Sequence, residues 1–162
     1  AIIEKQENYT DLNDYKADQL ISYSREIREK INKKYMDKFI HPFDSTIKDV
    51  SHILWVGEVI DEASSSRNAV FYGDKAIDRS PCGTGSSARM AQLFSENKLG
   101  VGETFIHESY IGSKFICRIE KSTKIRDFSG ITPVIRGWAR IHGYNKIIID
   151  DDDPFCRGFQ VI

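Results

Sequence analysis

The chain of 162 residues is long enough for one globular domain, and 40% of its residues are hydrophobic. Its 23 Lys and Arg side chains are matched by 24 Asp and Glu side chains, which gives a net charge of -1. This balance does not favour a nucleic-acid-binding protein, and no apolar run approaches the ~18 residues of a membrane span. Ala1–Tyr9 does not resemble a signal peptide. We expect a soluble, cytoplasmic protein that binds neither nucleic acid nor membrane.

The three cysteines, Cys82, Cys117 and Cys156, are odd in number and widely spaced, which argues against a disulfide framework. None of them forms a Cys-x-x-Cys pair, and the four histidines do not share one helical face. We therefore expect no metal site. The chain begins at Ala1 rather than Met, so we expect a processed protein or part of a longer one.

The first predicted element is a long amphipathic helix from Asp11 to about Asp37, continuous or interrupted, with Thr10 as a plausible N-cap. Leu20 and Ile27 belong to an apolar stripe at near-helical steps, and the residues between them are rich in Lys, Glu and Arg. The stretch His41-Pro42-Phe43 ends this element.

Two strands are predicted before Cys82, and a second helix is predicted after it. Ile53–Ile60 is apolar on both faces, as a buried strand is, and Asn68–Tyr72 is a shorter strand that leads to a turn. The helix is predicted from Thr84 or Ser86 to about Glu96. Further strands are predicted downstream at Glu103–His107, Lys114–Glu120, Val134–Ile141 and Lys146–Asp150. The fold class is α+β, with a largely antiparallel, barrel-like sheet around the central helix at about 84–96.

The stretch DRSPCGTGSSARMAQL, residues 78–93, places Cys82 between Pro81 and a Gly-Thr-Gly run. Because a helix follows at once, backbone N–H groups and the positive helix end converge beside the sulfur. Such an environment stabilises anions, including a thiolate. The simplest alternative is a tight turn in which Cys82 is a small buried side chain.

Three other interpretations of this stretch fit poorly. Gly83-x-Gly85-x-x-Ala88 satisfies the loose dinucleotide pattern, but the preceding strand ends about ten residues earlier instead of running into the glycines. A phosphatase-type loop needs an arginine six positions after the cysteine, and Arg89 lies seven positions on. A protease pair with His107 has no support beyond the presence of both residues.

The remaining interpretation is a thiol that exchanges protons with a substrate, as general base and general acid. The N–H groups of Gly83, Thr84 and Gly85 would hold a substrate carboxylate. Asp78 would receive a substrate ammonium, although an Asx turn or an ion pair with Arg79 is the plainer interpretation of that residue.

The sequence DRSPCGTG, residues 78–85, resembles the second cysteine motif of the proline racemase family, which includes hydroxyproline 2-epimerases. The resemblance extends to flanking stretches and covers most of residues 50–160. These stretches are Arg67–Gly73, Gly102–Phe105, Glu108–Phe115, Gly143-Tyr144, Asp152–Phe155 and Gly158-Phe159.

The resemblance implies a cofactor-independent isomerase in which two cysteines act on opposite faces of the substrate Cα. One thiolate removes the α-proton while the other thiol donates a proton to the opposite face. It also implies a fold of the diaminopimelate-epimerase type, with two similar α+β halves and the site in the cleft between them. Cys82 would be one of the two thiols, at the N-terminus of a helix that faces the substrate carboxylate.

The family's first cysteine motif, of Met-Cys-Gly-His-Gly character, does not occur in this chain. Cys117 lies in an alternating strand pattern, and Cys156 lacks a glycine-rich helix start, so neither replaces it. The chain is also about half the family's usual length. We expect residues 1–140 to be a C-terminal catalytic half-domain, inactive alone, and residues 141–162 to return to a missing N-terminal half.

The substrate is expected to be proline, with hydroxyproline as the alternative. The family position six before the motif aspartate lines the pocket and is Tyr72 here. Its aromatic ring favours proline, whereas its hydroxyl would meet a hydroxylated ring. An alternative of another class is a non-catalytic half-domain that binds small carboxylates or self-associates, for instance as a homodimer, through apolar surface.

Overall fold

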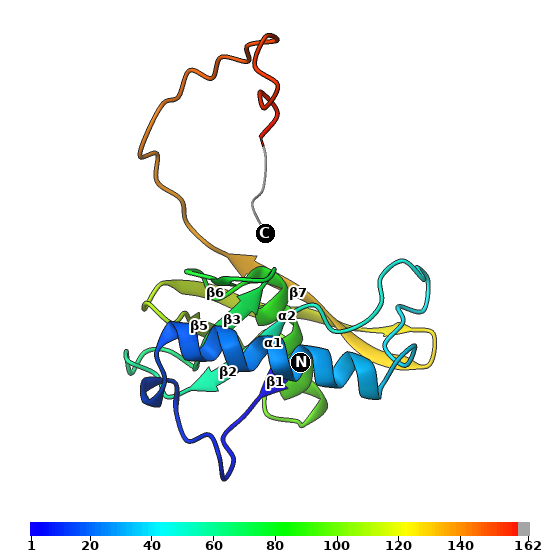
Figure 1. The fold of residues 1–162 in the computed structure, drawn as a ribbon. Helices are drawn as coiled ribbons and strands as arrows, with labels where there is room; N and C mark the ends of the chain where they lie inside the picture. Colours follow the sequence, from blue (N-terminus) through cyan, green and yellow to red (C-terminus); the bar gives the residue numbers. More distant parts are fainter. Residues whose placement is uncertain (159–162) are drawn as a thin grey trace.

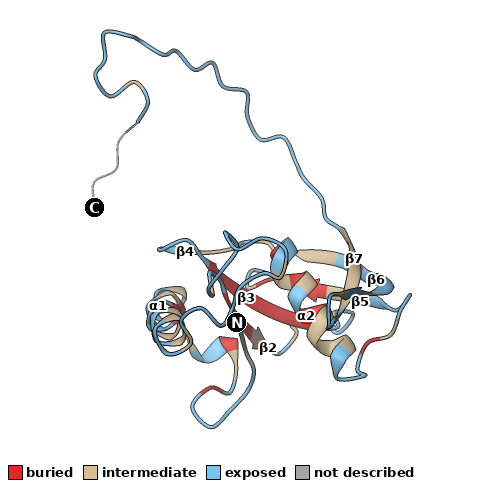
Figure 2. Ribbon diagram, turned by 90° about the vertical axis from the view of Figure 1, so that its right-hand side faces the viewer, coloured by how far each residue is buried: buried red, intermediate tan, exposed pale blue. Residues whose placement is uncertain are grey.

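The computed structural model describes residues 1–158, which form an α+β body followed by an extended C-terminal arm (Figure 1). The body comprises a mixed sheet and, in the described part of the chain, two α-helices. The predicted α+β class is confirmed. The arm, residues 137–158, runs away from the body and is almost entirely exposed (Figure 2).

The helix α1 spans Ala17–Lys34 and is shorter than the predicted helix at 11–37. A separate 3-10 turn, Leu12–Asp14, precedes it, because the Asp11 side chain accepts a hydrogen bond from the Asn13 N–H and caps that turn. Lys16 then adopts an extended conformation with ψ 157°, which separates the turn from the helix. The predicted helix was therefore correct in type and wrong at both ends.

The sheet has the strand order β1-β2-β3-β5-β6-β7, and β4 pairs with β3. The β1–β2 and β3–β5 pairs are parallel, and the other pairs are antiparallel. The strands are β1 Ile2–Ile3, β2 Ile53–Gly57, β3 Ser66–Tyr72, β4 Ala76–Ile77, β5 Thr104–Glu108, β6 Lys114–Ile125 and β7 Phe128–Arg136.

Two predicted strands near the C-terminus are wrong. The last described strand, β7, ends at Arg136 instead of continuing to Ile141, and residues 146–150 form no strand. The apolar run in the arm suggested a strand, but Ile147 is 83% exposed and no neighbouring strand pairs with it in the described residues. Return of residues 141–162 to a second half stays a prediction, and residues 159–162 lie outside the described residues.

Side chains of β2 and β3 alternate between two cores, as the pleat requires. Trp55 and Phe71 pack with Leu20 of α1 in one buried cluster. Leu54 and Val70 point to the other side and pack against Cys82. The helix α1 and the cysteine turn therefore lie on opposite faces of the same strand pair. The second helix, α2, spans Gly83–Ser95, and a third buried cluster lies between it and β5 and β6.

We expect Leu20→Ala to lower the free energy of unfolding by about 2–5 kcal/mol, because Leu20 is fully buried between α1 and the sheet. Urea unfolding followed by circular dichroism measures this change. The matched control is Glu29→Ala on the exposed face of α1, where a change within about 0.5 kcal/mol is expected. Equal effects of the two substitutions would contradict this assignment of the core.

Candidate active site

Cys82 is the N-cap residue of α2, as the sequence suggested. Its Sγ accepts a hydrogen bond from the Gly85 N–H at 3.3 Å and lies 3.3 Å from Thr84 Oγ1. The sulfur therefore occupies the place that a serine or aspartate oxygen takes at other helix starts. The sulfur thus lies at the end of α2 where the partial positive charge of the helix is concentrated.

The glycines beside Cys82 have different surroundings. A Cβ at position 85 would lie 3.1 Å from Val70 and 3.2 Å from the Cys82 Cβ, so glycine permits close packing of α2 on β3. A Cβ at position 83 would meet nothing within 4 Å. Gly83 therefore leaves open space next to the thiol.

The turn before Cys82 is held by its own side chains. Asp78 Oδ1 accepts a hydrogen bond from the Ser80 N–H at 2.8 Å, which is the Asx turn considered from the sequence. Ser80 Oγ in turn accepts one from the Cys82 N–H at 3.1 Å. No ion pair between Asp78 and Arg79 is present in the described residues. Binding of a substrate ammonium by Asp78 stays a prediction.

The backbone of Cys82 has φ 64° and ψ 124°, a region that residues other than glycine rarely adopt. Such a conformation costs about 1–3 kcal/mol and persists only where the surroundings enforce it. The Cys82 carbonyl accepts from the Ser86 N–H at 2.8 Å, and the Pro81 carbonyl accepts from Asn68 Nδ2 at 2.9 Å. These bonds hold the peptide groups on both sides of the cysteine.

Behind this turn lies a buried polar cluster formed by Asn68 of β3, Ser86 of α2 and His107 of β5, all with 0% exposure. Ser86 Oγ lies 2.8 Å from His107 Nδ1, and Asn68 Nδ2 lies 3.4 Å from the same nitrogen. The sequence indicated that His107 could lie near Cys82, but the roles of Asn68 and Ser86 were missed. The signal that could have revealed Asn68 is a polar residue just before the apolar run Ala69–Phe71 of a predicted strand.

Burial lowers the pKa of His107 from 6.5 to about 3, and the positive charge of Arg89 acts in the same direction. His107 is therefore neutral at physiological pH. In the described residues it makes no hydrogen bond to Cys82, and its Nε2 has no partner. These contacts do not support a Cys–His protease pair.

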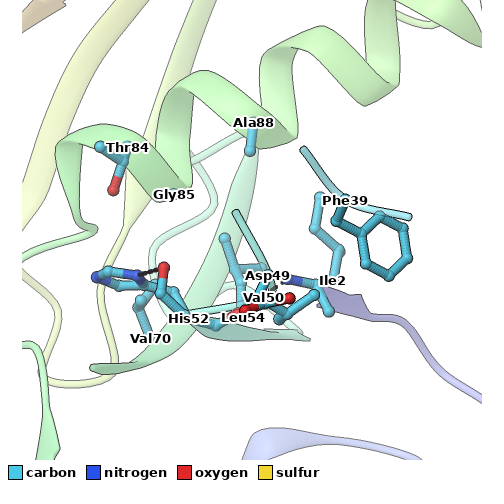
Figure 3. Close-up of a pocket in the computed structure, with 12 residues that line it drawn as sticks. Ile2, Phe39, Asp49, Val50, His52, Leu54, Val70, Thr84, Gly85 and Ala88 are labelled. Atoms are coloured by element: carbon cyan, nitrogen blue, oxygen red, sulfur yellow. Dashed lines mark hydrogen bonds between the residues drawn. The ribbon is translucent and has the colours of Figure 1, made fainter. Parts of the chain in front are cut away.

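A cavity of about 300 Å³ opens beside the start of α2 (Figure 3). Thr84 and Gly85 line it from the helix, Leu54 and Val70 from the sheet, and His52 from the chain before β2. Tyr72 does not line this cavity. It is 43% exposed and stacks on His52, with 6.5 Å between the ring centroids. Tyr72, which the sequence analysis placed in the substrate pocket, therefore contacts this cavity only indirectly, through His52.

The other two cysteines lie elsewhere. Cys117 is 2% exposed on β6 within the cluster beneath α2, which confirms its predicted place in the core. Burial raises the pKa of the Cys117 thiol to about 11. Cys156 lies in the C-terminal arm. None of the three cysteines lines the cavity beside α2, but Cys82 adjoins it through Thr84 and Gly85.

The phosphate-binding interpretations gain no support from the structure. Arg89 Nη1 donates to Glu4 at 2.6 Å and to Gln92 at 2.7 Å, so that guanidinium nitrogen is engaged away from the cysteine turn. Along the chain, the strand β4 comes between β3 and Gly83, so β3 does not run directly into the glycines as a dinucleotide-binding strand does.

Among residues 1–158, no group of three His, Cys, Asp or Glu side chains is arranged to hold a metal ion, and no helix is long and apolar enough to cross a membrane.

Cys82 thus lies at a strained helix N-cap, next to two residues that line a small cavity, and is backed by buried polar side chains. The family model described as proline racemase matches residues 1–160. The chain belongs to the proline racemase family, and the resemblance inferred from DRSPCGTG is confirmed.

The relatives include the 4-hydroxyproline 2-epimerase of Spirosoma linguale, which is 57% identical over 162 residues, covering 100% of this chain and 48% of the relative. The 4-hydroxyproline epimerase of Brucella ovis is 56% identical over 161 residues, covering 99% of this chain and 48% of the relative. The chain thus spans about half the length of the curated relatives it matches.

Two solved structures are similar to this fold. One is a hydroxyproline epimerase from Agrobacterium vitis with bound trans-4-hydroxy-L-proline, with a TM-score of 0.78, 28% identity and coverage of 89% of this chain and 40% of that chain. The other is a probable proline racemase from Agrobacterium radiobacter with bound carbonate, with a TM-score of 0.76, 30% identity and coverage of 89% and 41%.

The buried His107 predicts a specific pH dependence of stability. Between about pH 6.5 and about pH 3 the unfolded chain binds a proton at His107 that the folded chain does not bind. The free energy of unfolding therefore falls as the pH is lowered through this window, by at most about 1.4 kcal/mol per pH unit from this residue. Above pH 6.5 this contribution does not change.

Urea unfolding at about pH 7 and about pH 5 measures the effect. We expect His107→Asn to show a smaller loss of stability between these two pH values than the unsubstituted chain. The comparison removes the contribution of the carboxylates, which is common to both proteins. An equal loss in both proteins would show that His107 is not held neutral by the fold.

Proposed function

We propose that this chain carries one of the two acid–base thiols of a 4-hydroxyproline 2-epimerase. The main support is that relatives 55–57% identical across at least 99% of the chain are named 4-hydroxyproline epimerases. The similar fold of an epimerase with bound trans-4-hydroxy-L-proline adds to this support. The preference for proline rested on the aromatic ring of Tyr72 alone, and we now place hydroxyproline first.

In this proposal the Cys82 thiolate removes the Cα proton from one face of the substrate, and a second thiol donates a proton to the opposite face. The proton lost and the proton gained balance, so only the configuration at Cα changes. The backbone N–H groups of Gly83 and Thr84 have no intrahelical acceptors because they lie in the first turn of α2. They would hold the substrate carboxylate and stabilise the charge that develops on it during deprotonation.

The second thiol in this proposal comes from outside the described residues. Cys117 is enclosed in the core beneath α2, and its raised pKa disfavours the thiolate. Cys156 lies in the exposed arm. A single thiol cannot both remove a proton from one face of Cα and deliver one to the other, so inversion needs a cysteine that approaches the open space beside Gly83.

We expect the 162-residue chain alone to show no exchange of the Cα proton of trans-4-hydroxy-L-proline or L-proline with solvent deuterium. Proton NMR in deuterium oxide measures this exchange directly. Exchange accompanied by inversion at Cα in the unsubstituted chain, together with the loss of both in Cys82→Ser, would show that one thiol suffices and would contradict the two-thiol proposal.

Tyr72 provides a test of the substrate. In this proposal the ring of the bound substrate extends from the cavity beside α2 past His52 to the exposed Tyr72 hydroxyl. We expect Tyr72→Phe, made in the polypeptide that carries these residues in the cell, to lower kcat/KM for trans-4-hydroxy-L-proline by about tenfold, the value of one hydrogen bond. The same variant should leave kcat/KM for L-proline nearly unchanged, because proline has no ring hydroxyl. Equal effects on both substrates, or a preference of the unsubstituted protein for L-proline, would contradict the assignment.

A further inference from the structure

The polar cluster of Asn68, Ser86 and His107 contacts the turn that presents Cys82, yet proton transfer by Cys82 does not use it directly. We propose that His107 is a positioning residue for Cys82 and acts through Ser86 and Asn68. This inference rests on the proposed function only for its catalytic consequence. The geometric part concerns how the chain holds one thiol in place.

The contacts of the cluster converge on the two peptide groups that flank Cys82. Asn68 Nδ2 donates to the Pro81 carbonyl at 2.9 Å, and Ser86 Oγ lies 3.4 Å from the same oxygen. The Ser86 N–H donates to the Cys82 carbonyl at 2.8 Å. Because φ and ψ of a residue are the rotations between its two flanking peptide planes, holding both planes enforces the positive φ of Cys82.

His107 determines how the donors of this cluster are shared. The Asn68 amide nitrogen is a donor only and lies 3.4 Å from His107 Nδ1, and we assign Nδ1 as the acceptor of this contact. The shorter contact, 2.8 Å, brings the Ser86 hydroxyl to the same nitrogen. The single Ser86 hydroxyl hydrogen is then shared between His107 Nδ1 and the Pro81 carbonyl, 3.4 Å away, and Asn68 remains the main donor to that carbonyl.

This role requires a neutral imidazole, because protonation would place a hydrogen on Nδ1 opposite the Asn68 amide hydrogens. Burial in the body between α2 and the sheet keeps His107 neutral, with 0% exposure. Because none of its surface is exposed, His107 cannot contact a substrate that approaches the cysteine turn from solvent. His107 is therefore a positioning residue and not a catalytic one.

The test measures the rate at which iodoacetamide alkylates Cys82 in the folded chain at neutral pH, by peptide mass spectrometry, with Cys156 as an internal reference. His107→Phe keeps a ring and removes the acceptor, and we expect it to slow alkylation of Cys82 about tenfold. The reason is that Sγ moves away from the Gly85 N–H and the helix end that stabilise the thiolate. We expect His107→Asn, whose amide oxygen can replace Nδ1 as an acceptor, to restore most of the rate.

Two further variants keep the result interpretable. Phe105→Leu is the matched control, because Phe105 shares the buried cluster beneath α2 and its ring lies tilted 4.9 Å from that of His107, but its side chain makes no hydrogen bond to the turn. It should destabilise the chain and leave the Cys82 alkylation rate unchanged. Ser86→Ala removes the other partner of the 2.8 Å contact and should slow alkylation as His107→Phe does, even if His107→Phe fails to fold.

An alkylation rate that is unchanged or raised in both His107→Phe and Ser86→Ala overturns the proposal, and so does an equal decrease in Phe105→Leu. In the polypeptide that carries these residues in the cell, His107→Phe should lower kcat for epimerisation by more than tenfold with little change in KM. Alkylation does not depend on a substrate. Absence of epimerase activity in the unsubstituted protein would therefore contradict the proposed function and leave the positioning test valid.

Discussion

The site depends on the positive φ of Cys82, because this conformation turns the chain from an Asx turn directly into the first turn of α2. A cysteine in an ordinary extended N-cap would follow a different path from Pro81. The strain is sustained by hydrogen bonds to the carbonyls of Pro81 and Cys82 from residues of β3 and α2. The thiol is thus held by the sheet as well as by its own helix.

The alternation of side chains in β2 and β3 explains why Cys82 is held rigidly. One face of the strand pair is covered by α1 through Trp55 and Phe71, and the opposite face supports Cys82 through Leu54 and Val70. A rigid scaffold that fixes a reactive group to within a fraction of an ångström is what proton transfer at carbon requires. Packing by α1, far from the chemistry in sequence, therefore contributes to the geometry of the thiol.

The exposed arm contrasts with the compact body. Large apolar side chains such as Trp138, Tyr144 and Ile148 are between 66% and 92% exposed. In the body, comparable side chains are buried against α1 or α2. Apolar side chains gathered on an exposed segment mark a surface that interacts with other protein. That residues 141–162 pack on another half of the protein stays a prediction.

Local sequence determined much of what surrounds Cys82. The DRSPCGTG motif identified the family, a helix that begins close to Cys82 and, as one of two interpretations of Asp78, the Asx turn, because caps and turns depend on neighbouring residues. Only the tertiary structure decided that Asn68, Ser86 and His107 meet, since β3 and β5 pair in parallel across a long separation in the chain. It also decided that the apolar run at 146–150 forms no strand, because a strand requires a hydrogen-bonding neighbour that local sequence does not supply.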